Sequence, residues 1–362
     1  MKKLLVIGLL LLVGASALFA DDASVMPKMV GRFYVAPIYS FAMGEYDTDG
    51  KYHKYGDNSL KLFNLGFALE YGINDWITAA VQWVPGWTPW SNIRAATGLY
   101  DTNTNGVADI FAGAKFLIVG EKAPINASMV RFSVAPGVII PLPGPNFVDQ
   151  LNKVDMANLE GHDATLYSMD NHVFAGGGRF YFDFVLNKNF FINLYNETIV
   201  YPFKQDLNKS GAKFYGAKLE AYSAMGDPQI LAIGGEINYK YSLTFEIEPV
   251  FSMPIADGIN FTAGLPVNYN FKPAYSYSFN IPAALAPYAD VIEEGLLSEG
   301  ALDTDPHHII SLNPNISVFF MKTPLPLEFK FTYGLPVWGQ NALARHNASL
   351  QIRAYFALPG AR

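Results

Sequence analysis

The sequence predicts an all-β fold, namely a transmembrane antiparallel β-barrel of about 14 strands, within a range of roughly 12 to 16. Three observations support this prediction: two-faced alternating segments, a low charge content, and connections that alternate between short and long. Of the 362 residues, 51% are hydrophobic and 15% are aromatic, whereas only 16% are charged. Soluble domains carry about 25% charged residues, so this composition favours a chain with a large lipid-facing surface.

The N-terminus has the pattern of a secretion signal. Two lysines precede a short apolar run, and small residues follow it. This pattern predicts a signal peptide over residues 1–20, cleaved after Ala17 or Ala20, and an outer-membrane β-barrel domain over 21–362. The chain has no cysteine, which excludes disulfides and zinc–thiolate sites. We therefore expect localisation in the cell outer membrane of a diderm bacterium.

The clearest alternation lies in a hairpin over residues 61–87. In its first strand the odd positions from Phe63 to Tyr71 are large and apolar, and most even positions up to Glu70 are small or polar. The chain turns at 72–75 and returns with the same two faces. A period of two indicates an extended strand. In a membrane barrel the bulky face meets lipid and the other face lines the lumen.

The same alternation predicts the remaining strands and a regular order of connections. Strands are expected over residues 29–42, 107–119, 129–141, 172–186, 190–201, 229–239, 243–253, 259–270, 274–281, 307–321, 327–338 and 348–358. Short turns are expected at 72–75, 120–128, 187–189, 240–241, 271–273 and 322–326, with long loops between them. Outer-membrane barrels have short periplasmic turns and long external loops. A soluble β-sandwich remains the alternative at this point.

Several turn and lumen motifs resemble those of a known family. They are Glu70-Tyr71-Gly72-Ile73-Asn74-Asp75, Gly106-Val107-Ala108-Asp109, Gly113-Ala114-Lys115 and the proline-containing run at 138–144. Residues 30–145 thereby resemble the meta-pathway of phenol degradation family of outer-membrane proteins, although Ala108 replaces a family glycine. The resemblance implies a transport barrel for hydrophobic or aromatic substrates, with no catalytic residues. The fatty-acid outer-membrane channel family is similar in architecture, but its N-terminal plug is not expected here, because about ten residues separate the expected cleavage site from the first strand.

Charged and amide residues recur on the predicted inner faces. The candidate lumen-lining residues are Glu70, Gln82, Asp109, Lys115, Arg131, Arg179, Asp183, Glu197, Glu236, Glu246, Glu248, Glu328, Lys330, Gln351 and Arg353. As a set they predict an aqueous path whose charge tunes selectivity. For any single residue, pairing across strands to close a narrow barrel is the alternative.

A polar loop before the strand at 107–119 has the beginning of a cation-binding pattern. Asp101, Asn103, Asn105 and Asp109 have the spacing of a calcium loop. The acidic residue expected at position twelve is absent, because Ala112 stands there. We therefore favour an external turn rich in Asp and Asn, and we expect no metal site.

These patterns together predict a channel or transporter for small hydrophobic or aromatic molecules. No enzyme activity and no cofactor are expected. The expected partners are outer-membrane lipid, the barrel-assembly machinery and the solutes themselves; the excess of acidic residues argues against nucleic acid. The alternative is a surface-exposed structural or adhesive barrel that does not conduct and whose loops bind host or matrix.

Overall fold

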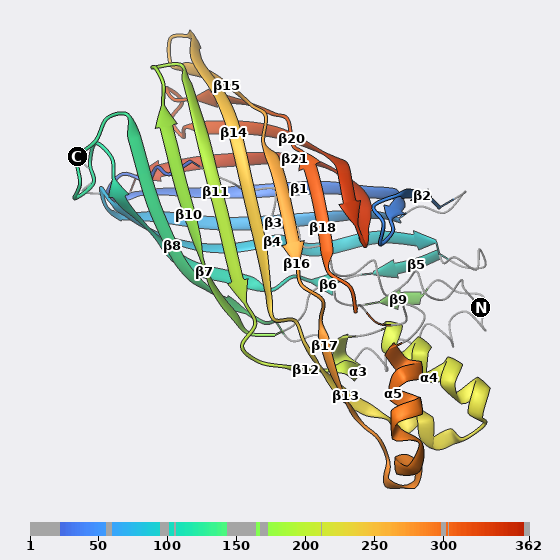
Figure 1. Cartoon of the computed structure of the whole chain (residues 1–362). Helices are drawn as coiled ribbons and strands as arrows, with labels where there is room; N and C mark the ends of the chain where they lie inside the picture. The colour runs from blue at the N-terminus through green and yellow to red at the C-terminus, as the bar shows by residue number, and fades with distance from the viewer. Residues whose placement is uncertain are drawn as a thin grey trace.

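The computed structural model describes residues 22–55, 60–94, 101–104, 106–142, 164–166, 173–210, 212–297, 302 and 304–357. Within these residues the chain forms a closed antiparallel barrel of 12 strands, with a separate sheet of three short strands beyond it (Figure 1). The all-β barrel predicted from the sequence is confirmed, with slightly fewer strands than 14.

Neighbours in the barrel wall follow the order of the chain. β1 pairs with both β3 and β21, which closes the sheet on itself. The uninterrupted wall strands are β1 (Val30–Tyr46), β3 (Leu60–Asn74), β4 (Ile77–Arg94), β7 (Ile110–Val119), β8 (Val130–Ile140), β10 (Ala175–Val185), β11 (Phe190–Val200), β14 (Tyr241–Ala256), β20 (Leu327–Gln340) and β21 (Ala342–Ala357).

The other two wall strands are each interrupted at a proline. β15 (Ile259–Gly264) and β16 (Val267–Lys272) both pair with β14, and Pro266 lies between them. β18 (His307–Leu312) and β19 (Asn315–Phe320) are separated in the same way by Pro314. Proline has no N–H to donate to a β-ladder. The two interruptions lie next to each other, since the N–H of Asn313 donates to the carbonyl of Pro266 at 2.8 Å.

Two segments predicted as wall strands lie outside the barrel, which explains the difference in strand number. β13 (Gly234–Asn238) comes from the predicted strand 229–239, and β17 (Ser276–Asn280) comes from 274–281. They pair with each other and with β12 (Gln205–Asp206) in the small sheet. The predicted periplasmic turns at 240–241 and 271–273 are therefore wrong: both lie at the end of the barrel that carries the long connections. Alternation identifies a strand, but not the sheet to which it belongs.

The two faces of the wall have the chemistry that the hairpin predicted. Outward side chains such as Phe33, Leu69 and Val81 are 40–50% exposed. Inward side chains of the same strands, such as Tyr34 and Glu70, are buried. An exposed apolar outer surface around a polar interior is the pattern of a barrel that spans a lipid bilayer. No described helix is long and apolar enough to cross a membrane.

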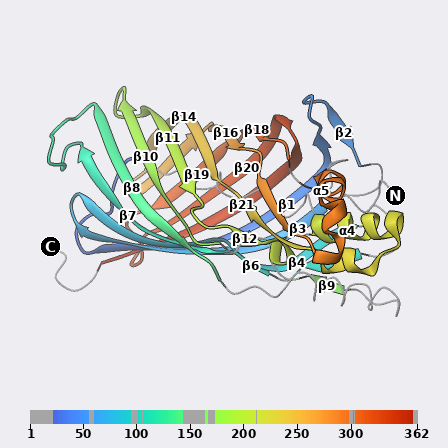
Figure 2. The ribbon, with the colours of Figure 1, turned by 60° about the horizontal axis from the view of Figure 1, so that its bottom comes forward.

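The long connections at one end of the barrel carry the remaining elements. These are β2 (Tyr52–Lys54), β5 (Asp101–Thr104), β6 (Gly106–Val107), β9 (Ala164–Leu166), α3 (Leu207–Ser210), α4 (Ala212–Met225), the 3-10 helices η2 (Pro228–Ala232) and η3 (Ala283–Tyr288), and α5 (Ala289–Leu297). In Figures 1 and 2, α4 and α5 lie together beyond this end of the barrel. The described residues of 201–240 and 273–306 form a small folded unit, which we call the cap.

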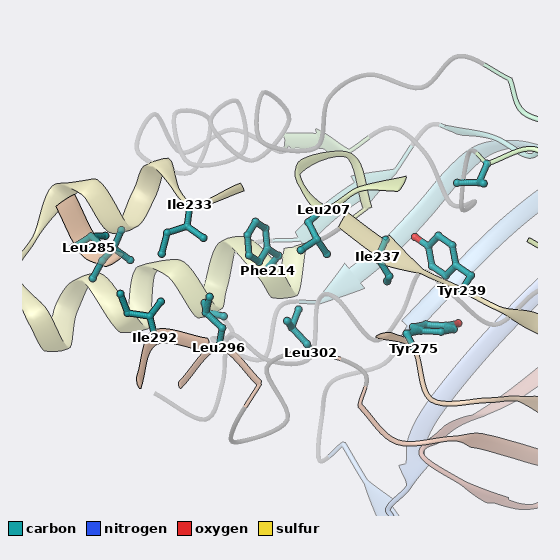
Figure 3. Close-up of a cluster of buried hydrophobic side chains, with 13 residues drawn as sticks. Leu207, Phe214, Ile233, Ile237, Tyr239, Tyr275, Leu285, Ile292, Leu296 and Leu302 are labelled. Atoms are coloured by element: carbon teal, nitrogen blue, oxygen red, sulfur yellow. The ribbon is translucent and has the colours of Figure 1, made fainter. Parts of the chain in front are cut away.

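The cap has a hydrophobic core of its own. Phe214, Ile233 and Leu296 belong to a buried cluster that also takes in residues of the small sheet (Figure 3). Lys218 of α4 is buried beside this core, and its Nζ donates to the carbonyl oxygens of Leu231 and Ile233 at 3.2 and 3.3 Å. Burial lowers the pKa of this lysine, although Asp206 opposes the shift. The helix α5 lies in the connection between β17 and β18.

Candidate functional site in the barrel lumen

A chain of paired side chains runs along the inner wall, and we call it the charged belt. Arg32 on β1 binds Glu70 on β3, with 2.5 Å between Nη2 and Oε2. The other carboxylate oxygen of Glu70 accepts from Nε2 of Gln82 on β4 at 3.5 Å. Neighbouring strands therefore present alternating positive, negative and neutral groups at one level. The buried charges of Arg32 and Glu70 are opposite partners, which offsets the cost of removing them from water.

Arg179 carries the charged belt across the lumen. Its Nη1 donates to Oε1 of Gln82 at 2.6 Å, although β10 and β4 are separated in the wall by β7 and β8. Its Nε binds Glu197 on β11 at 2.6 Å, and Tyr195 donates to the same carboxylate oxygen at 3.0 Å. The guanidinium lies 3.8 Å from the ring centroid of Phe111, a cation–π contact. One side chain thus joins strands that are not neighbours in the wall.

A second ion pair lies on the inner faces of β20 and β21. Arg353 Nη1 lies 3.3 Å from Oε2 of Glu328, and Tyr355 donates its hydroxyl to the same oxygen at 2.8 Å. Gln351 accepts from Nε and Nη2 of Arg353 at 2.9 and 2.6 Å. This group is next to the charged belt, since the guanidinium groups of Arg32 and Arg353 each lie 5.9 Å from the ring of Tyr34.

The described residues before β1, from Asp22 onward, lie inside the lumen. The N–H of Ala23 donates to both carboxylate oxygens of Asp183 at 3.0 Å, and the carbonyl of Ala23 accepts from Ser133. Lys115 donates to the carbonyl of Asp22 at 2.9 Å. Arg131 donates to the hydroxyl of Ser24 at 2.6 Å and lies 3.5 Å from Asp183. We call residues 22–28 the N-terminal segment.

The N-terminal segment also binds the wall near the short turns. The N–H of Met26 donates to Thr78 Oγ1 at 2.7 Å, and that of Lys28 donates to Asp75 Oδ1 at 3.2 Å. The N-terminal segment is extended, and side chains of the wall satisfy its backbone groups. Sequence reasoning considered only a folded plug and so missed this element.

A small pocket remains between the N-terminal segment and the charged belt. Its volume is about 30 Å³, and its lining includes Met26, Glu70, Gln82, Lys115 and Arg179. A water molecule needs roughly 10–15 Å³ on this measure, so the pocket has room for about two waters. The lumen beside β4, β7 and β10 is therefore narrow and mostly filled by side chains and the N-terminal segment.

The wall around β14 differs, because amides replace arginines there. Glu248 is 4% exposed, and Asn193 and Asn315 donate to its two oxygens at 3.2 and 2.8 Å. Gly264 makes room for this arrangement, since a Cβ at that position would contact Oε1 of Glu248. Glu246, two residues earlier, is also buried and pairs in register with Asn268 of β16.

The remaining candidates from the sequence have other positions. Lys330 shares the inner face of β20 with Glu328 and Thr332 and is only partly buried. Asp109 precedes β7, and its Oδ1 accepts from the N–H of Leu142 at 3.0 Å. Glu236 is on β13 of the cap and binds Lys204 at 3.1 Å. Its assignment to the lumen is wrong, because its strand is not part of the barrel.

The candidate cation loop is only partly within the described residues. Asp101 and Asn103 belong to β5, while Asn105 lies outside the described part of the chain. Among the residues that the structure describes, no group of three or more His, Cys, Asp and Glu side chains could hold a metal ion. The role of this loop therefore remains a prediction.

Sequence reasoning also missed several uncharged or unexpected members of the lumen. Arg32, Asn193 and Asn315 were not singled out, although each lies on an inward face. The period of two would have found Arg32, since it alternates with outward Phe33. The two asparagines carry no charge, so the search for charged inner faces overlooked them.

The closed wall, the apolar outer face and the polar interior define this chain as an outer-membrane β-barrel protein. Among solved structures, it is similar to an outer-membrane channel from Pseudomonas putida F1, with a TM-score of 0.59, 12% identity, and coverage of 94% of this chain and 100% of the other. That similarity supports the barrel fold.

Two further structures have lower similarity. The P. putida toluene transporter TodX has a TM-score of 0.40 and 10% identity, with 95% of each chain covered. The beta domain of the Bordetella autotransporter BrkA has a TM-score of 0.42 and 8% identity, with 91% of this chain and 100% of the other covered. No family model and no curated protein matches the chain, so the resemblance to the phenol-degradation family stays a prediction.

Proposed function

We propose that this protein is an outer-membrane channel for small hydrophobic or aromatic molecules. The observation that carries the proposal is the lumen: in the described part of the chain, a closed barrel has a polar, side-chain-lined interior that holds a short extended segment. A barrel of eight strands is just filled by its own side chains, so one of 12 strands has more interior than the wall needs. The fold shared with an outer-membrane channel supports the same reading.

The narrow interior favours small solutes. A pocket of about 30 Å³ lies between the charged belt and the N-terminal segment in the described part of the lumen. Aromatic rings line this region, including Phe111 and Tyr181. Flat apolar molecules can pack against such rings, whereas a large hydrated solute would have to displace the N-terminal segment. We propose the candidate lumen residues from Glu70 to Arg353, without Glu236, as the lining of this route.

Uptake by whole cells tests the proposal, because the outer membrane itself is the barrier to be crossed. A strain lacking the gene and the same strain expressing the protein would receive labelled toluene, and entry would be followed over the first seconds. Faster entry with the protein is the expected result. Equal entry, with a correctly folded barrel shown by a heat-modifiable gel shift, would refute the channel.

One observation supports a second candidate function, a surface-binding barrel. The cap contributes 12 of the 13 residues of a buried cluster and lies at the long-connection end of the barrel (Figure 1). A folded external unit suits recognition of a partner as well as it suits control of entry. Planar-bilayer conductance separates the two functions, because a purely adhesive barrel would not conduct.

A further inference from the structure

The lumen carboxylates differ in their partners. Glu70, Glu197 and Glu328 each bind an arginine, and Asp183 binds Arg131. Glu248 has only the amides of Asn193 and Asn315 within bonding distance. Two neutral donors solvate a carboxylate, but they do not balance its charge, and a buried unpaired charge is costly.

Several buried polar atoms on the inner faces from β11 to β21 have no hydrogen-bond partner in the described structure. Asn193 uses its Nδ2 on Glu248, and its Oδ1, on the same amide, is buried and has no partner in the structure. Thr332 Oγ1 and Ser349 Oγ are likewise buried without a partner. We call Asn193, Glu248, Asn315, Thr332 and Ser349 the amide patch.

The strand register places the members of the amide patch next to one another. Asn193 pairs with Glu248 across β11 and β14. Asn315 of β19 pairs with Thr332 of β20, and Thr332 pairs with Ser349 of β21. The bond from Asn315 to Glu248 joins the two groups over Gly264. The inner wall thus presents one anion and several neutral oxygens from neighbouring strands.

We propose that the amide patch binds the ammonium group of an organic cation, a protonated primary amine on a small apolar body, with Glu248 as its counter-ion. An ammonium group has three donors and one positive charge. It therefore supplies the charge that Glu248 lacks, and it can donate a hydrogen bond to Oδ1 of Asn193, which is on the amide that binds Glu248. Charge-assisted bonds of this kind are the stronger ones. The inference rests on the proposed channel, because it names a class of solute that the channel would select.

Binding of matched solutes to the purified barrel tests this site. Benzylammonium and benzyl alcohol have the same ring and differ in the charged group, so they separate charge recognition from apolar partition. Equilibrium binding would be measured with the full-length protein in nanodiscs. We expect the native protein to bind benzylammonium at least tenfold more tightly than benzyl alcohol. Absence of this preference would overturn the proposal.

Three variants locate the site. Glu248→Gln should lose the preference for the amine, whereas Glu248→Asp, which retains the charge, should keep part of it. The matched control is Glu236→Gln, the same chemical change on the exposed cap, and it should bind like the native protein. An unchanged preference in Glu248→Gln would place the amine elsewhere and refute the assignment. If Glu248→Gln does not fold, the comparison of the two solutes on the native protein and on Glu248→Asp decides.

This test is independent of the channel itself. Binding requires a folded lumen but no conductance or uptake. A protein that takes up toluene without preferring benzylammonium would disprove the amine site and leave the channel standing. A protein that binds benzylammonium through Glu248 but takes up no solute would support the amine site and disprove the channel.

Discussion

Two sides of the lumen bury acidic groups in different ways. On the side of β3, β4, β10 and β11, every carboxylate of the charged belt has a guanidinium partner, and Arg179 ties the wall together across the interior. Around β14 and β19, Glu248 is held by amides alone. The first arrangement stabilises the barrel and closes it. The second leaves the charge available to a solute.

The charge of a lumen residue does not by itself show whether the residue stabilises the wall or binds a solute. Glu197 and Glu248 are both buried glutamates on inward faces of adjacent strands. The first is neutralised by Arg179, and the second has no cation in the described structure. Substitutions on the two sides should therefore have opposite profiles: stability should change on one side and recognition on the other.

Removal of Arg179 should have the largest effect. Arg179→Ala would leave Glu197 buried without its cation and break the link to Gln82, and loss of one partner of a buried pair costs about 3 to 5 kcal/mol. Denaturant unfolding in micelles, followed by the heat-modifiable gel shift, would measure the loss. A decrease of less than about 1 kcal/mol, the size expected of a surface pair, would show that the charged belt does not stabilise the wall.

Deletion of the N-terminal segment should open the charged side of the lumen. Without residues 22–28, Asp183, Arg131 and Lys115 lose their backbone and hydroxyl partners, and the space beside β7 and β8 becomes available to solvent. We expect a severalfold increase in single-channel conductance in planar bilayers. Ser24→Ala removes one contact only and should conduct like the native protein. Unchanged conductance after the deletion would mean that ions avoid this side.

Alanine substitutions at two glycines should distinguish a position next to fixed backbone from a position next to a movable side chain. At Gly177 of β10 a Cβ would contact the backbone carbonyl of Thr198, which cannot move without the strand. At Gly264 it would contact the carboxylate end of Glu248, a flexible side chain. Gly177→Ala should therefore lower stability by about 1–3 kcal/mol, as overpacking does.

Gly264→Ala should change stability less and recognition more. Displaced from its place over Gly264, Glu248 would lose the bond to Asn315, and the preference for benzylammonium should weaken. Unfolding curves and amine binding on the same preparations measure both properties. Equal loss of stability in the two alanine variants would contradict the contrast between the two sides.

The smallest effect is expected at an exposed pair that belongs to neither side. Lys204 and Glu236 are about half exposed on the cap, with 3.1 Å between Nζ and Oε2. Exposed ion pairs contribute about 0 to 1 kcal/mol, so Lys204→Ala should unfold almost like the native protein. This variant is the baseline for Arg179→Ala. A large loss here would show that the cap and the barrel unfold together.

The wall strands were predictable because each shows its two faces to two different solvents. The alternation from Phe63 to Tyr71 requires no knowledge of partners: lipid selects one face and the lumen the other. Segments 229–239 and 274–281 alternate as well, but they bury their apolar face on α4 and α5 in the cap. Local sequence does not show whether such a strand belongs to the barrel or to the cap, so the 14 predicted strands exceed the 12 strands of the barrel.

The sequence by itself determined the barrel class, the lipid face and the inward position of most charged residues, because a period of two acts within one strand. Only the tertiary structure decided which charges are paired. Arg179 reaches Gln82 across two intervening strands, and Ala23 reaches Asp183 over 160 residues of chain. Closure of the barrel brings such groups together. It also leaves Glu248 among amides, a property that no spacing along β14 could reveal.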